Sequence, residues 1–140
     1  MKAQCEVTNA GDHIRVRIGN PVTVAAVDAC AAEAVRLASE VTTDGSFQFL
    51  VDLRGTSNQD SMSRTFWYIR EEFSSHKMLR SSRIALLVDA DEPTYAFVET
   101  TSQNAGFVVQ RFLDERSALA WLLPEPTKAP SEPTELKARS

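Results

Sequence analysis

The chain has 140 residues, of which 43% are hydrophobic and 24% are charged, which is enough apolar material for one ordinary core. Its 15 Lys and Arg against 19 Asp and Glu give a net charge of -4, which argues against nucleic acid as a partner. No apolar run approaches the ~20 residues of a spanning helix, and the first residues lack the apolar region of a signal peptide. We therefore expect a cytoplasmic protein that is not transmembrane.

The first 41 residues predict a β-hairpin followed by a helix. Apolar and polar residues alternate on both sides of a turn, which would place Val7 opposite Ile14 and a solvated His13 on the polar face. Thr23 has the position of a helix N-cap, and apolar residues recur at helical spacing after it.

The middle of the chain predicts two central parallel strands at residues 47–53 and 84–88. Both segments are almost continuously apolar, as in strands that are covered on both faces. The segment between them predicts a helix at residues 61–73, with Tyr68 on its outer side and an inward stripe formed by Met62, Phe66, Ile69 and Phe73.

The last elements complete an alternating pattern of strands and helices. Pro93 follows a run of acids and predicts a helix start, Gly106 predicts its end, and residues 107–112 predict a strand near an edge of the sheet. Asp114 would cap the final helix. The order of elements predicts an α/β fold with a single mixed sheet, in which an antiparallel hairpin precedes parallel strands joined by helical crossovers.

The composition changes after residue 123. Four of the six prolines lie in residues 124–140, with only one large aliphatic side chain, so we predict a domain at 1–123 and a Pro-rich disordered tail at 124–140. Neither GxGxxG nor GxxxxGK[ST] occurs in the chain, so a glycine-rich phosphate loop is not indicated.

Two stretches resemble a known family. Residues 49–61 read FLVDLRGTSNQDS, which is similar to the strand, loop and helix start of the STAS superfamily. Residues 107–122 read FVVQRFLDERSALAWL, which resembles the SpoIIAA-like branch, also described as STAS/Sec14-like. The resemblance implies a SpoIIAA-like fold over residues 4–123.

The resemblance also suggests a regulatory site at the helix start. In anti-sigma-factor antagonists of this family the first Ser after such an Asp is phosphorylated, which maps onto Ser61 with Asp60 before it. A helix N-terminus tolerates a phosphate, and Arg54 would balance its charge. Together with Ser57, these residues form a candidate surface for a protein partner. The alternative is structural, with Asp60 as N-cap and Ser61 as the first helical residue.

Similarity to Sec14-like lipid carriers implies a second kind of site, an apolar pocket between the sheet and the helices. The candidate lining residues are Phe66, Trp67, Tyr68, Phe73 and Phe97, although aromatic residues at helical spacing are also typical of an ordinary core. Because Trp67 lies beside the inward stripe, it would face a groove, the solvent or a second copy in a homodimer.

Catalysis is the third hypothesis. The chain has two histidines, and a hydrolase would need Ser57 or Ser61 to meet His76 and Asp89 across the fold, without the glycines of a nucleophile elbow.

Metal and redox sites are not favoured by the sequence. Asp52, Asp89 and Asp91 would lie near strand ends and could hold Mg²⁺, but such residues more often cap turns. Cys5 and Cys30 lack a CxxC spacing and a nearby histidine, so we expect no disulfide framework and no zinc site, and interpret both as small core residues.

These observations favour a non-enzymatic regulatory or protein-interaction domain with no cofactor and no metal. The alternative is a carrier or sensor of a small apolar or lipid-like ligand, and a small hydrolase is the third choice.

Overall fold

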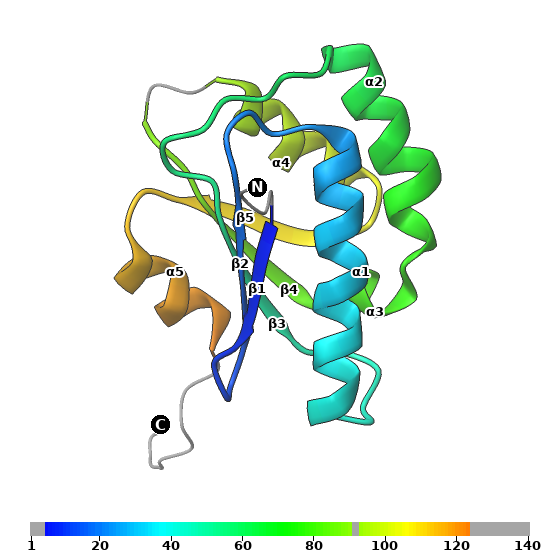
Figure 1. Ribbon diagram of the computed structural model, residues 1–140, viewed down its shortest axis with the longest axis vertical. Coiled ribbons are helices and arrows are strands. Elements are labelled where there is room, and N and C mark those ends of the chain that lie inside the picture. Colours follow the sequence, from blue (N-terminus) through cyan, green and yellow to red (C-terminus); the bar gives the residue numbers. More distant parts are fainter. Residues whose placement is uncertain (1–4, 91–92, 124–140) are drawn as a thin grey trace, which may run out of the picture.

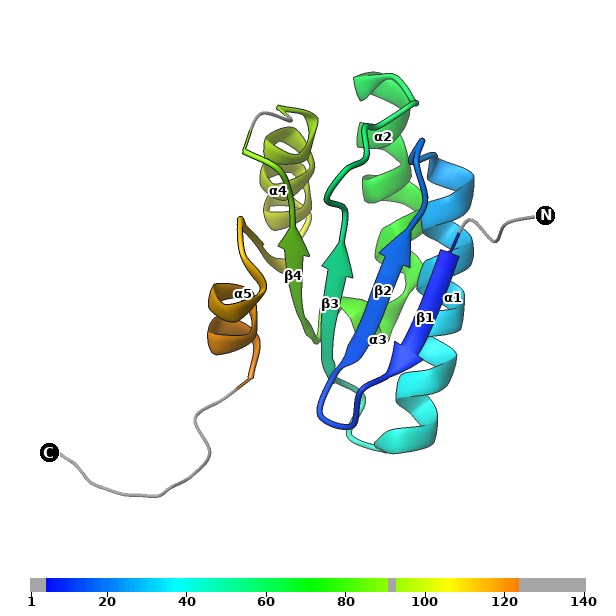
Figure 2. The ribbon, with the colours of Figure 1, turned by 60° about the vertical axis from the view of Figure 1, so that its left-hand side comes forward.

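A computed structural model of the chain describes residues 5–90 and 93–123. Its strands are β1 (Cys5–Asn9), β2 (Ile14–Ile18), β3 (Gln48–Asp52), β4 (Arg83–Leu87) and β5 (Val108–Phe112). They form one sheet in the order β1-β2-β3-β4-β5, where β1 and β2 are antiparallel and the later neighbours are parallel. Figure 2 shows the first four strands side by side. The predicted α/β fold with a single mixed sheet is confirmed.

Helical segments connect the strands and cover the sheet. They are α1 (Val24–Val41), α2 (Met62–Trp67), the π-helix η1 (Tyr68–Glu72), the 3-10 turn η2 (Phe73–Ser75), α3 (Lys77–Arg80), α4 (Thr94–Asn104) and α5 (Glu115–Leu122). Thr23 and Asp114 cap α1 and α5 as predicted, because their side chains accept hydrogen bonds from the backbone N–H groups of Ala26 and Ser117. In Figure 1, α1 and α5 lie on opposite sides of the sheet.

The hairpin forms where it was predicted, but its register differs by two residues. Val7 pairs with Val16 and not with Ile14. Because side chains alternate with period two, this shift keeps each side chain on its predicted face. The turn lies one residue further along the chain than predicted, and His13 belongs to it. His13 was expected to be solvated but is buried, with its Nδ1 2.8 Å from Asp12 Oδ1.

The helical segment after β3 buries a different face from the predicted one. Met62 is 53% exposed, whereas Tyr68, expected on the outer side, is buried. The reason is a change of winding, since the N–H of Phe73 donates to the carbonyl of Tyr68 five residues earlier. This wider π-helical turn brings Tyr68 and Ile69 inward together, and Thr65 takes the buried position expected for Phe66.

The two faces of the sheet carry separate cores. The larger core lies under α1 and α4 and includes Ile14, Val16, Phe49, Ile84 and Val109, and a small cluster of Val24, Tyr68 and Ile69 joins η1 to α1 beside it. The smaller core joins Leu50, Ala85 and Leu87 to Ala118 and Leu122 of α5. Strands β3 and β4 contribute to both, which explains their continuous apolar sequence.

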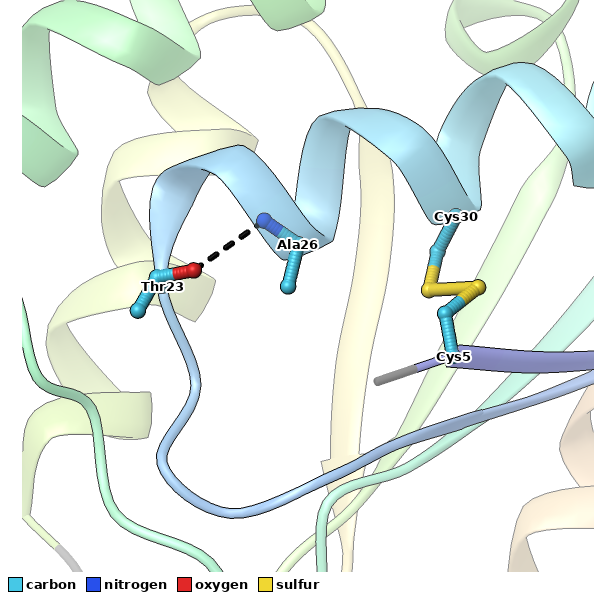
Figure 3. Close-up of a disulfide and its surroundings, with 4 residues drawn as sticks. All are labelled: Cys5, Thr23, Ala26 and Cys30. Carbon is cyan, nitrogen blue, oxygen red and sulfur yellow. Dashed lines mark hydrogen bonds between the residues drawn. A yellow bond between two sulfur atoms is a disulfide. The ribbon is translucent and has the colours of Figure 1, made fainter. Parts of the chain in front are cut away.

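The cysteines overturn the sequence-based interpretation, because Cys5 of β1 and Cys30 of α1 form a disulfide (Figure 3). The sequence predicted two separate core residues, since cysteines 25 positions apart give no spacing signal. The hairpin and α1 bring them together. Disulfides are rare in the reducing cytosol, so the state of this pair bears on the predicted cytoplasmic location, which stays a prediction.

Strand β5 forms an edge of the sheet, as its polar residues predicted. Side chains of α4 bind two of its backbone groups: Glu99 Oε2 accepts from the N–H of Arg111 at 2.9 Å, and Gln103 Nε2 donates to the carbonyl of Val109 at 2.8 Å. These contacts protect part of the edge from pairing with another strand.

Two other expectations concern the tail and the membrane. The tail predicted at residues 124–140 lies outside the described residues, so the predicted domain boundary stays a prediction. Within residues 5–90 and 93–123, no helix combines the length and the apolar character that a bilayer crossing requires.

Candidate functional site

An apolar cavity of about 130 Å³ lies inside the larger core. Strands β2 to β5 form its floor through residues such as Val16, Phe49 and Ile84, while α1 and α4 contribute Ala31, Ala34 and Val98 to its walls. No charged side chain of residues 5–90 and 93–123 lines the cavity. The arrangement suits an uncharged, mainly apolar molecule.

The cavity follows from the small residues that α1 turns toward the sheet. The buried side chains of this helix are mostly alanines, and Cys30, Ala31 and Ala34 line the cavity. A methyl group reaches only a short distance from the helix, so it leaves space above the strand residues that a leucine would fill. The alanine-rich stripe was visible in the sequence, but its consequence depends on the distance between helix and sheet.

Polar contacts tie α1 to the π-helix that closes the cavity. The Tyr68 hydroxyl donates to Asp28 Oδ1 at 2.9 Å, and His76 Nε2 lies 3.5 Å from the same oxygen. Burial, together with the hydrogen bond to Asp28, raises the pKa of Tyr68 far above its usual value. Tyr68 therefore stays a neutral donor whose ring forms part of the cavity wall.

The loop at residues 54–61, called the 54–61 loop below, lies against the segment that begins α1. The N–H of Val22 donates to the carbonyl of Ser57 at 2.9 Å, and the N–H of Gln59 donates to the carbonyl of Val22 at 2.7 Å. Asn20 Oδ1 also accepts from the N–H of Ser57 at 3.0 Å. These bonds pair the loop with the chain at the start of α1 in the manner of a short parallel bridge.

Asp60 and Ser61 have different structural roles from those in the capping alternative. Ser61 is the N-cap of α2, since its Oγ accepts from the N–H of Arg64 at 3.0 Å. Asp60 Oδ2 accepts from the N–H of Val24 at 2.6 Å, so this carboxylate lies at the N-terminus of α1. The sequence could not show this, because the two elements are 36 residues apart. Ser61 is exposed.

Arg54 is engaged with Asp52 at the end of β3. Its Nε and Nη2 atoms lie 3.0 and 2.9 Å from the two carboxylate oxygens, and Arg17 Nη1 lies 3.1 Å from Oδ1. Arg15 lies 3.6 Å from Asp52 and 3.0 Å from Glu115. Burial raises the pKa of Asp52, but the hydrogen bonds and charges of Arg54 and Arg17 outweigh it, and the pKa is lower than usual.

The aromatic pocket candidates are divided by the structure. Phe73 lines the cavity, as does Tyr68, whereas Phe66, Trp67 and Phe97 are not among its lining residues. Trp67 is 55% exposed and packs edge-to-face against Phe66. The change of winding at η1 accounts for Phe66 and Trp67, which belong to α2, whereas Phe97 belongs to α4 and is a separate departure from the prediction.

The hydrolase arrangement is not assembled. His76 contacts Asp28, and Asp89 Oδ2 accepts from the N–H of Gly55 at 2.6 Å. In the part of the chain that the structure describes, neither His13 nor His76 hydrogen-bonds a serine hydroxyl. Among the described residues, the proposed pairing of Ser57 or Ser61 with His76 is therefore not formed.

The three aspartates considered for Mg²⁺ have other surroundings. Asp52 lies among arginines, Asp89 binds a backbone N–H, and Asp91 lies outside the described residues. Among residues 5–90 and 93–123, no group of three or more His, Cys, Asp or Glu side chains is placed to hold a metal ion.

Five polar residues of the cavity wall were not predicted from the sequence, namely Thr23, Asn58, Thr65, Tyr95 and Ser102. Tyr95 and Ser102 are on α4 and buried, and the hydroxyl of Tyr95 lies 2.8 Å from Thr56 Oγ1. For Ser102 the available signal was the run of poor helix formers at residues 100–102, because hydroxyl side chains in a helix either face the solvent or form a hydrogen bond.

Comparison with known proteins supports the fold. No protein-family model matches the chain, and no curated protein matches it. A crystal structure of an uncharacterised protein from the DUF3478 family of Shewanella loihica, described as having a SpoIIAA-like fold, is similar to it with a TM-score of 0.54. The two share 12% identity, and the match covers 85% of this chain and 92% of that one. This chain has a SpoIIAA-like fold, as the resemblance implied.

Proposed function

We propose that this SpoIIAA-like domain binds a small, mainly apolar molecule in the cavity between the sheet, α1, η1 and α4, and that it does so without catalysis. The observation that carries the proposal is the cavity itself, about 130 Å³ with almost wholly apolar walls. An engineered apolar cavity of about 150 Å³ in another protein binds benzene or xenon, so this volume accommodates a ligand of one small ring.

The energetics of packing support a binding role. At about 24 cal/mol per Å³, a cavity of this size costs about 3 kcal/mol of stability, which is large against the 5–15 kcal/mol typical of domains. A ligand that fills the space restores the lost dispersion contacts. The non-enzymatic part of the proposal is supported by the wall, where no histidine and no carboxylate of the described residues is present.

Toluene is a suitable probe of the cavity. We expect it to shift the NMR signals of lining methyl groups such as those of Ile84 and Val109 and to raise the melting temperature. Ala34→Leu fills the cavity from α1 and should abolish both effects. Ala32→Leu adds the same side chain on the exposed side of that helix and should leave them intact. Equal toluene binding by both variants would contradict the proposal.

A second candidate function is protein binding by the 54–61 loop and the exposed side of α2. The observation that favours it is the exposure of two large apolar side chains just after the Ser61 hydroxyl, Met62 at 53% and Trp67 at 55%. Phosphorylation of Ser61 would add up to about two negative charges beside this surface and change which partners it accepts. Self-association through Trp67 is one form of this candidate.

Two measurements test the second candidate. Mass spectrometry of the protein from its own cell should find phosphate on Ser61, and Ser61→Asp should alter the set of bound proteins. Trp67→Ala should weaken self-association in sedimentation experiments, while Phe97→Ala on α4 serves as a control. An unmodified Ser61, an unchanged partner set and an unchanged sedimentation coefficient would together remove this candidate.

A further inference from the structure

One polar group in the cavity wall is left unmatched by the protein. Ser102 lies on α4, is only 4% exposed and lines the cavity. Among residues 5–90 and 93–123, its hydroxyl has no hydrogen-bond partner. Buried polar groups in native proteins are almost always paired, so each exception needs an explanation.

The other polar side chains of the wall are all matched within the protein. Thr23 accepts from the N–H of Ala26, and Tyr68 donates to Asp28. Asn58 donates to Thr65, and the hydroxyl of Tyr95 is bonded to Thr56. Among the polar side chains of the wall that the structure describes, Ser102 therefore is the one whose hydroxyl lacks a partner in the protein.

We propose that the ligand is an uncharged molecule with a single hydroxyl or carbonyl group, which forms a hydrogen bond with Ser102 while the rest of the ligand contacts the apolar walls. The inference rests on the proposed ligand-binding function and names its chemical class, a small neutral alcohol, phenol or ketone. A charged ligand is disfavoured, because no charged side chain of the described residues lines the cavity.

Water is a poorer partner for this hydroxyl than such a ligand. A buried water needs two to four polar groups, whereas the wall offers Ser102 as its one unmatched side chain among the described residues. An organic ligand supplies the single hydrogen bond and fills the apolar space at the same time. The cavity thereby selects for one polar group on an otherwise apolar body.

Phenol and toluene test the inference, because they have similar shape and differ by a hydroxyl in place of a methyl group. Affinities of both are measured by titration at pH 7 for the wild type and for Ser102→Ala. We expect the ratio of phenol to toluene affinity to fall about 2- to 10-fold in Ser102→Ala, the range of one net hydrogen bond. Thr101→Val is the matched control, since Thr101 is equally buried but does not line the cavity, and its ratio should not change.

The outcomes separate this inference from the proposed function. If toluene binds but Ser102→Ala leaves the ratio unchanged, the polar-group inference is overturned and the apolar cavity proposal stands. If neither probe binds the wild type, both are overturned. A second readout needs no variant: NOEs from the Ser102 β-protons should reach the ortho protons of bound phenol, and NOEs only to the para proton would count against the inference.

Discussion

The two faces of the sheet are both covered by helices but are packed in different ways. On the α5 face, the five core residues Leu50, Ala85, Leu87, Ala118 and Leu122 are all 0% exposed. On the opposite face, a much larger set of apolar residues surrounds a cavity of about 130 Å³. None of the five residues of the smaller core lines this cavity, so its space lies on the α1 face of the sheet.

The helix residues that meet the sheet account for this difference. Strands β3 and β4 present large side chains to both faces, but α5 brings Leu122 against them, while α1 brings Ala31 and Ala34. An alanine-rich helix can cover a sheet without filling the space above it. A residue can thus be buried without the space around it being filled, and the cavity lies where the side chains of α1 are buried but too small to fill the space.

The largest expected effect is the loss of a large side chain from the filled face. Leu122→Ala should lower the free energy of unfolding by about 2–5 kcal/mol, because its surroundings cannot collapse into the space. Leu79→Ala is the matched change on the cavity face, since Leu79 is 3% exposed and already borders the cavity, and we expect a smaller loss. Urea unfolding measures both, and equal losses would refute the contrast between the two faces.

The disulfide between Cys5 and Cys30 belongs to the cavity face, where Cys30 is one of the lining residues. Because the bond closes a loop across 25 positions, reduction should lower the free energy of unfolding by about 2–4 kcal/mol. Thiol titration of the unfolded, unreduced protein should find no free thiol from this pair. If both thiols are instead alkylated when the cells are lysed, the disulfide is absent in the cell and the two cysteines are small core residues, as the sequence predicted.

Replacing a buried alanine by leucine tests the same difference between the two faces, because the added atoms need free space. Ala118→Leu on α5 should cost about 1–3 kcal/mol, because its site is filled. Ala34→Leu on α1 should be neutral or stabilise the fold, because the cavity receives the added atoms. Both alanines are buried and face the sheet from a helix, so helix propensity affects them in the same direction. Destabilisation of equal size at both positions would show that the cavity face is as tightly packed as the other.

The smallest expected effect concerns the polar part of the α5 face, where Asp52 lies among arginines. Asp52→Asn should lower stability at pH 7 by about 1 kcal/mol, since the arginines remain partly exposed to solvent. The folded-state pKa of Asp52 is lowered, so its contribution is present above the ordinary carboxyl pKa and disappears as the pH falls through the folded value.

Unfolding curves of the wild type and Asp52→Asn should therefore converge in acid. Arg36→Ala is the control, because Arg36 forms ion pairs with Glu33 and Glu40 on the outer side of α1. These charges are exposed and screened by solvent, so this change should leave stability within the error of the measurement. If the difference in the free energy of unfolding between wild type and Asp52→Asn stays constant with pH, the ion pairs of Asp52 do not cause that difference.

The sequence by itself determined the order of the five strands, the main helices α1, α4 and α5, the mixed sheet and the caps at Thr23 and Asp114, but not the π-helix η1, the turn η2 or the short helix α3. These depend on local signals: alternation in strands, helical spacing of apolar residues and side chains that bond a backbone N–H three residues later. Such signals involve neighbours in the chain, so one sequence contains them in full.

Only the tertiary structure decided the hairpin register, the winding at Tyr68, the partner of Asp60, the disulfide and the cavity. The partner of Asp60, the disulfide and the cavity depend on elements that are far apart in sequence, whereas the register and the winding are local choices that the packing against the rest of the fold decides. Asp60 looked like a cap for the next helix, but Val24 of another helix lies within its reach. In the sequence Ser102 is one of several polar residues in a weakly predicted helix, and only the packing of α4 shows that it lines an apolar cavity.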